Sequence, residues 1–221
     1  NKEVVSTYVG QKLTQVEDQT VTPAEIQAMT YDTSYRLSGA TQGDRGTVTY
    51  GYNPDDTVAI LAAQGDPTAT YIYYPDGSLN TIGWSPVAGQ FKYRYTLPGQ
   101  YQSVTLPNGQ TRNYSYDDQG RLLELSNLDP VAGNLATYGY AYDHNHYTGT
   151  DTMLGQRTNL TSTVPSQGLS GALTKYYYDS LYQLNRADYP AGAPWNGEVH
   201  SWTYDALGNR LTNTVNSTTQ N

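Results

Sequence analysis

One stretch of the chain decides how it folds: Tyr114-Ser115-Tyr116-Asp117-Asp118-Gln119-Gly120-Arg121-Leu122. Tyr114 and Tyr116 are two residues apart, so both lie on one face of a β-strand, with a polar residue between them. Asp117 and Gly120 then mark a reversal, because Asp bonds its own backbone in turns and Gly adopts a positive φ without strain. Leu122 leads a second strand, and the stretch therefore predicts a β-hairpin.

The same pattern recurs along the whole chain. Nine tyrosines begin a copy of it, most of them 21 to 23 residues apart, with gaps of 26, 36 and 26 toward the C-terminus. These anchor tyrosines are Tyr8, Tyr31, Tyr52, Tyr74, Tyr95, Tyr116, Tyr142, Tyr178 and Tyr204. A period of this length means one supersecondary unit copied in series. The sequence therefore predicts an all-β protein, a single array of about nine hairpins over residues 1–221.

Bulky residues also precede the anchors by two positions, on the same face of each strand. They are Met29, Tyr50, Ile72, Tyr93, Tyr114, Tyr140, Tyr176 and Trp202. A further set of residues defines the repeat, and we interpret its acids as turn formers and its arginines as partners of turn carboxylates or carbonyls. The set comprises Tyr31, Asp32, Tyr116, Asp117, Gly120, Arg121, Tyr178, Asp179, Tyr204, Asp205, Gly208 and Arg210.

The segments Tyr-Asp-x-x-Gly-Arg-Leu at 116–122 and Tyr-Asp-Ala-Leu-Gly-Asn-Arg-Leu-Thr at 204–212 resemble the YD repeat of the Rhs (rearrangement hotspot) family. That family includes bacterial polymorphic toxins, toxin-complex shell proteins and teneurins, and the similarity covers about residues 1–215. The resemblance implies serial hairpins in a long, strongly curled antiparallel sheet, as a segment of a spiral, shell or tube. It also implies a non-enzymatic wall of an extracellular shell or scaffold that encapsulates a passenger polypeptide.

The number of strands points the same way. Nine hairpins give about eighteen strands, and open twisted sheets rarely pass about ten strands without curling. The first and last strands are edges, which proteins either cover or use for pairing. We therefore expect adjacent YD repeats, or further copies of the chain, as partners through the edge strands. The alternative function is a self-assembling surface fibre, tube or sheath.

Composition narrows the class of protein. The 221 residues include 23 Tyr but one Phe and no Cys, and the formal net charge is −8. A tyrosine-rich interior keeps hydroxyl groups for water or a neighbouring strand, which suits a sheet with one wet face. The acidic balance argues against nucleic acid, and no apolar run is long enough to span a membrane. We expect an extracellular or cell-surface location, with a secretion signal absent or removed.

Nothing in the sequence favours an enzyme or a cofactor. There is no Cys nucleophile and no Gly-x-Ser-x-Gly segment, and the acids mostly occupy turn positions. The family also has a self-cleaving region, which resembles an aspartate-dependent protease with an Asp-Pro-x-Gly motif. The nearest string here, Asp129-Pro130-Val131-Ala132-Gly133, has one extra residue, so the activity is not carried over.

Insertions interrupt the period near residues 143–155, 165–171 and 189–197. The first places His144 and His146 between Asp143 and Asp151, ligand types that suit a divalent metal, although we favour a plain polar hairpin tip. The third contains Trp195, which suits a sugar-stacking platform, although we favour a plug beneath a crossing loop. A carbohydrate- or receptor-binding adhesion module that recognises a cell-surface glycan is therefore a further alternative.

Overall fold

The computed structural model describes residues 3–21, 25–43, 45–151, 154–192, 196–216 and 218–220. These residues form β-strands joined by turns, with a single 3₁₀ turn (Pro165–Gln167) and no α-helix among them. None of the described elements is a helix long and apolar enough to cross a membrane. The chain groups into two compact units, residues 1–93 with 105–108 and residues 94–104 with 109–221.

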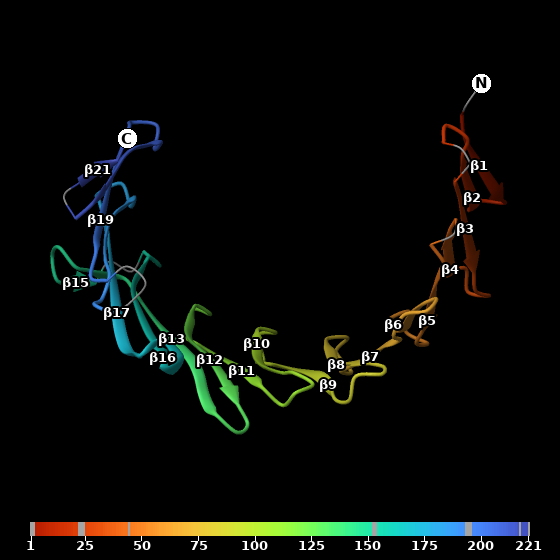
Figure 1. Cartoon of the computed structure of the whole chain (residues 1–221), viewed down its shortest axis with the longest axis horizontal. Coiled ribbons are helices and arrows are strands. Elements are labelled where there is room, and N and C mark those ends of the chain that lie inside the picture. The colour runs from red at the N-terminus through yellow and green to blue at the C-terminus, as the bar shows by residue number, and fades with distance from the viewer. Residues whose placement is uncertain are drawn as a thin grey trace. The chain divides into compact units, whose positions relative to one another are not determined.

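Unit 1 is a run of antiparallel hairpins in chain order (Figure 1), in which each strand pairs with the next, from β1 through β8. The strands are β1 (Val4–Val9), β2 (Lys12–Asp18), β3 (Glu25–Tyr31), β4 (Leu37–Gln42), β5 (Thr47–Tyr52), β6 (Val58–Ala63), β7 (Ala69–Tyr73) and β8 (Leu79–Trp84). Two strands, β9 (Gln90–Tyr95) and β10 (Tyr101–Thr105), lie where the chain divides into its two units.

Unit 2 continues with hairpins of the same kind. Its strands are β11 (Thr111–Tyr116), β12 (Leu122–Asp129), β13 (Gly133–Tyr142), β14 (His144–Asn145), β15 (Thr150–Asp151), β16 (Arg157–Val164), β17 (Leu169–Tyr178), β18 (Leu184–Asp188), β19 (Val199–Tyr204), β20 (Arg210–Val215) and β21 (Thr218–Gln220). Each pairs antiparallel with its neighbour in the chain, except that β13 pairs with β16 and the short β14 and β15 pair with each other. The predictions of an all-β class and of serial hairpins are confirmed.

Very little of either unit is buried. Among the described residues, the buried apolar side chains are Ala69, Val164, Leu169, Tyr176 and Ala187, and no large side chain is fully buried. Most strand residues are half-buried instead, as a single layer of strands requires. The units therefore depend on backbone pairing and on contacts between neighbouring hairpins more than on a hydrophobic core.

Candidate functional site

The feature that most hairpins share is their turn, and the hairpin of β11 and β12 shows it most clearly. The backbone N–H of Asp117 donates to the carbonyl of Arg121 (3.0 Å), and Gly120 N–H donates to the Asp117 carbonyl (2.9 Å). Gly120 has a φ of +80°, the left-handed conformation that closes a three-residue hairpin loop. The residue four positions after the anchor has positive φ in six other hairpins too, counted from Tyr73 in the fourth: Tyr35, Asp56, Gly77, Gly99, Tyr182 and Gly208.

A one-residue β-bulge accompanies the turn. In the β11–β12 hairpin Ser115 pairs with Glu124 and Tyr116 with Leu122, so Leu123 is left out of the register. The same shift occurs immediately before Tyr8, Tyr31, Tyr52, Tyr73, Tyr142, Tyr178 and Tyr204. A bulge increases the local twist of a hairpin and reorients the side chains beside it. The anchor tyrosine is therefore set at a defined angle in each copy.

The residue after the anchor organises the loop with its side chain. Asp117 Oδ1 accepts from the backbone N–H of Gln119 (3.0 Å) and of Arg121 (2.9 Å), and Asp179 and Asp205 accept in the same way. Burial raises the pKa of Asp117, but the N–H and the guanidinium of Arg121 outweigh it and hold that pKa below its usual value. These contacts bring the predicted residues Asp117, Gly120 and Arg121 together at one turn.

Six of the anchor tyrosines also join their hairpins to the preceding ones. The hydroxyl of Tyr142 donates to the backbone carbonyl of Leu122 at 2.8 Å, and that carbonyl belongs to the residue beside the bulge of the earlier hairpin. Burial raises the pKa of the Tyr178 hydroxyl, which makes the equivalent contact. The equivalent pairs are Tyr31 with Leu13, Tyr52 with Leu37, Tyr73 with Val58, Tyr178 with Arg157 and Tyr204 with Leu184, at 2.6 to 2.9 Å.

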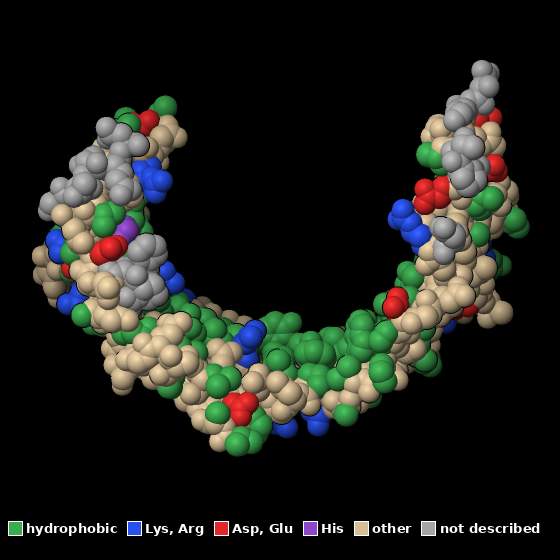
Figure 2. Space-filling model, viewed as in Figure 1, with side chains coloured by type: hydrophobic (Ala, Val, Ile, Leu, Met, Phe, Trp, Pro, Cys, Tyr) green, Lys and Arg blue, Asp and Glu red, His purple; other side chains and the backbone are tan. Residues whose placement is uncertain are grey.

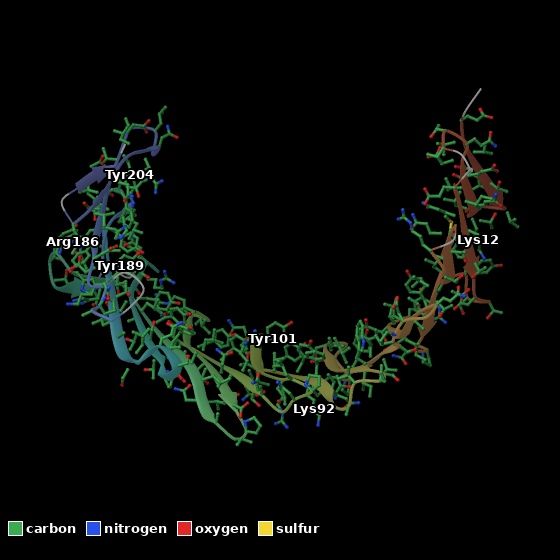
Figure 3. The ribbon with its side chains drawn as sticks, viewed as in Figure 1. Lys12, Lys92, Tyr101, Arg186, Tyr189 and Tyr204 are labelled. Atoms are coloured by element: carbon green, nitrogen blue, oxygen red, sulfur yellow. The ribbon has the colours of Figure 1, made fainter. Side chains whose placement is uncertain are left out.

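A second contact between hairpins comes from the residue that closes each turn. Arg121 binds Asp117 of its own turn (2.6 Å) and Asp143 of the next (2.5 Å), with its guanidinium 4.6 Å from the ring centre of Tyr142. Arg36 does the same with Asp32, Asp56 and Tyr52. Where the position is not Arg, other donors reach the next turn or its anchor: Lys12 to the rings of Tyr31 and Tyr35, Gln100 to the Gly120 carbonyl, and Gln156 to the Tyr182 carbonyl. Lys12 is marked in Figure 3.

Two positions of the expected repeat need correction. In the fourth hairpin the anchor is Tyr73 and not Tyr74, because Tyr73 carries the bulge and reaches Val58, while Tyr74 N–H closes the turn onto Ser78. In the last hairpin Asn209, not Arg210, takes the place of Arg121, because the Asn209 side chain bonds Asp205 (2.9 Å). The Tyr73 register also replaces Ile72 by Tyr71 as the bulky residue two positions earlier.

The proposed metal ligands do not converge. Asp143 pairs with Arg121, His144 Nδ1 lies 3.2 Å from Asp151 Oδ1, and His146 Nε2 lies 2.8 Å from Asn159 Oδ1. Within the described ranges, no three His, Asp or Glu side chains are grouped so that they could hold a metal ion. Trp195 lies outside the described residues.

The Asp-Pro string is a turn. The Asp129 carboxylate accepts from the backbone N–H groups of Ala132 (2.8 Å) and Val131 (2.9 Å) and from the Gln110 side chain (3.2 Å). These hydrogen bonds, led by that of Ala132, lower the pKa of Asp129. A carboxylate held in its ionised form by a turn has an adequate structural explanation there.

Removing one junction hydroxyl tests its contribution. Tyr142→Phe keeps the ring beneath Arg121 but deletes the donor to the Leu122 carbonyl. We expect a loss of about 1 kcal/mol in unfolding free energy, the usual net value of such a hydrogen bond. Tyr35→Phe is the control, since that side chain is 74% exposed and keeps its ring beneath Lys12. Equal denaturant midpoints for Tyr142→Phe and the unmodified chain would contradict the role given to the hydroxyl.

The turn carboxylates predict a loss of stability in acid. The Arg121 guanidinium lowers the pKa of Asp143, and the Asn209 side chain lowers that of Asp205. Depressed pKa values stabilise the fold above the unfolded Asp pKa of about 3.9, and this contribution disappears as pH falls through the folded values. The thermal midpoint, followed by circular dichroism, should hold steady above about pH 5 and decline below about pH 4.

Asp143→Asn should lower that midpoint at pH 7 and make its decline in acid shallower, because one of the carboxylates held by Arg121 is gone. Asp151→Asn is the matched control in the same insertion, with a side chain that is 76% exposed. A midpoint that rises on acidification would contradict the prediction.

Comparison with known proteins finds one matching repeat family and several solved structures with a similar fold. The family model for the RHS Repeat matches residues 99–132, and no curated protein matches the chain. The crystal structures of TcdB2-TccC3-Cdc42 and of TcdB2-TccC3 each have a TM-score of 0.65, are 13% and 14% identical, and match 96% and 97% of this chain. A third, TcdB2-TccC3 without its hypervariable C-terminal region, has a TM-score of 0.53 at 13% identity over 98% of this chain.

The chain spans 14% of the length of each of those structures, so the likeness concerns the fold of a segment. The turn, bulge and tyrosine contacts described above recur through both units, inside and outside the matched repeat. The expected resemblance to the YD-repeat, or Rhs, family is therefore confirmed, by the family model at residues 99–132 and by the likeness of the fold over nearly the whole chain.

Proposed function

We propose that this chain is a non-enzymatic wall segment of an extracellular shell or scaffold, which holds a passenger polypeptide against one face of its sheet. The observation that carries the proposal is the tyrosine face, which we define as the anchors and the residues two positions before them. Its bulky members before the anchors are Met29, Tyr50, Tyr71, Tyr93, Tyr114, Tyr140, Tyr176 and Trp202.

The chemistry of this face suits an unfolded guest. Most of its rings are half-buried, and several hydroxyls are fixed to backbone carbonyls, as in Tyr52 and Tyr204. Figure 2 shows hydrophobic side chains gathered over β7 and β8 in unit 1 and over β11 to β13 in unit 2. Rigid aromatic rings supply contact area at low cost in conformational entropy, while the tyrosine hydroxyl groups keep the surface from being entirely apolar. Such a surface holds extended chains weakly and without sequence preference.

Three considerations support a structural role as a wall segment over a catalytic role. The acids of the repeat are engaged in turns, as Asp117 and Asp205 show, so the structure accounts for them without a reaction. The repeated bulges add twist to every hairpin, which favours a curled sheet. The resemblance to toxin-complex shell proteins supplies the wall, the passenger and the extracellular setting, all of which are proposals for this chain.

The absence of cysteine from the chain allows a direct test. Arg112 and Ser115 are both exposed and lie on opposite faces of β11, with Arg112 on the tyrosine face. An unfolded reporter polypeptide with one cysteine is fused to the C-terminus through a Gly/Ser linker long enough to reach either face. We expect its disulfide to form several-fold faster with Arg112→Cys than with Ser115→Cys, after each thiol is normalised against glutathione disulfide. Equal rates at the two positions would overturn the proposal.

A second candidate is self-assembly into a fibre, tube or sheath through edge strands. The observation that favours it is β1, which pairs with β2 along one side, while Val4, Tyr8 and Val9 remain 58%, 59% and 69% exposed. Tyr8 also lies beside a bulge of the kind that precedes other anchors. At those other anchors, such as Tyr31, the tyrosine hydroxyl binds the preceding hairpin. An edge strand of this kind is a template for pairing with another chain.

Sedimentation and electron microscopy of the purified chain distinguish the two candidates. Extended polymers that Val4→Lys abolishes would favour assembly, because a charge on an edge strand opposes pairing. Val21→Lys is the control, since Val21 is exposed but lies outside the strands. Discrete monomers at high concentration would contradict self-assembly and would agree with the wall-segment proposal.

A further inference from the structure

The first insertion builds something that the ordinary turns lack. The backbone N–H of Asp143 donates to the Gln156 carbonyl (2.8 Å), so the insertion leaves and rejoins its hairpin at the base of a normal turn. Between these points, β14 and β15 pair as a small hairpin, with His144 opposite Asp151 and Asn145 opposite Thr150. Residues 144–151 therefore form a small extra hairpin, the insertion hairpin, between β13 and β16 in unit 2.

The insertion hairpin contacts later strands of unit 2. The hydroxyl of Tyr147 donates to Asn185 Oδ1 (3.0 Å), and His146 Nε2 lies 2.8 Å from Asn159 Oδ1. The rings of His146 and Tyr147 both lie 5.0 Å from the ring of Tyr177, measured between centres. Contacts to three later strands, β16, β17 and β18, thus hold the described part of the insertion in one place.

The ring of Tyr177, against which the insertion hairpin packs, is itself held in place by its neighbours. The Tyr177 hydroxyl donates to Asp188 Oδ2 (2.9 Å), and Arg186 donates to both oxygens of the same carboxylate (2.6 and 3.0 Å). The Arg186 guanidinium, labelled in Figure 3, lies 5.0 Å from the ring centre of Tyr177. A charge-assisted pair of this kind limits the motion of the ring. The insertion therefore packs against a preorganised surface, as binding sites require.

A cavity of about 490 Å³ lies between the insertion and the turn of the next hairpin. Its aromatic walls are Tyr147, Tyr176, Tyr178 and Tyr182, and Gln156 and Asp179 are among its polar groups. The volume falls within the range of about 300 to 1,000 Å³ that small-molecule sites occupy, and aromatic walls with few polar groups are their usual lining.

Tyr182 contributes to this cavity in an unfavourable backbone conformation. Its φ is +64°, at the turn position that is glycine in four other hairpins and that Tyr35 and Asp56 also occupy at positive φ. A bulky residue at positive φ is an outlier that costs stability, and such outliers concentrate at functional sites. The ring of Tyr182 is 59% exposed, so burial in a core does not compensate for the strain.

The lining groups select the class of ligand. Of the described residues around the cavity, none is Lys or Arg, which disfavours an anion, and both imidazoles already contact other side chains, which disfavours a metal ion. Aromatic faces beside amide and carboxylate oxygens suit a neutral molecule with apolar C–H faces and many hydroxyl groups. We infer that this cavity binds a sugar unit of a neutral glycan.

The test uses the full chain and a panel of neutral sugars: glucose, galactose, mannose and N-acetylglucosamine. Saturation-transfer NMR should detect at least one of them, and its affinity should fall at least tenfold in Tyr182→Gly. This variant removes the ring and installs the residue that other turns use, so the fold should be kept or stabilised. Tyr35→Gly is the matched control, because it makes the same change at the same turn position of a hairpin in unit 1, at a φ of +69°.

Binding that Tyr182→Gly weakens and Tyr35→Gly leaves intact supports the sugar site. Failure of every neutral sugar to bind overturns it, as does equal binding by Tyr182→Gly and the unmodified chain. Preferential binding of a sugar phosphate or a sialylated sugar also overturns it, because the class of ligand would then be anionic. Tyr176 and Tyr178 belong to both the cavity and the tyrosine face, whereas Tyr182 belongs to the cavity alone. The Tyr182→Gly variant therefore tests the sugar site separately from the proposed wall segment.

Discussion

The hydrogen bond from an anchor tyrosine to the carbonyl beside the previous bulge is the contact on which the array depends. A single layer of strands has no core to hold its hairpins together, and few described side chains are buried. The bulge disrupts the strand ladder locally, and the carbonyl that accepts the hydroxyl belongs to a residue next to it. The tyrosine thus satisfies a backbone group and joins two hairpins with one side chain, which a Phe at the same position could not do.

Magnitudes rank the other junction contacts below this one. Six such hydroxyl bonds, at about 1 kcal/mol each, contribute several kcal/mol in total. The arginine pairs contribute less, because exposed ion pairs are worth about 0 to 1 kcal/mol and the Asp56 side chain paired with Arg36 is 75% exposed. The pair of Arg121 and Asp143 is better shielded from solvent, with side chains that are 28% and 14% exposed. The tyrosines therefore provide the cohesion, while the arginines fix which turn lies beside which.

Sequence periodicity predicted the hairpins and most anchors because the spacing, the turn residues and the aromatic alternation agree with one another. It failed at Tyr73 and Tyr74, where two adjacent tyrosines leave the register undecided until the reach of a hydroxyl settles it. It also misaligned Arg210, by matching the Arg-Leu pair instead of counting from the anchor. The packing of His146 and Tyr147 against Tyr177 joins residues about thirty positions apart, and no local pattern specifies such a contact.

Repetition and its interruption suit different kinds of recognition. A face that every hairpin renews presents the same rings along the sheet, so it can only hold a guest by many weak and equivalent contacts. A specific ligand needs a concave site with a unique set of groups, and in a serial array these arise where one turn is enlarged against its neighbour. The strain at Tyr182 is local to its turn, because hairpins with glycine at the same position, such as that of Gly120, adopt this conformation without strain.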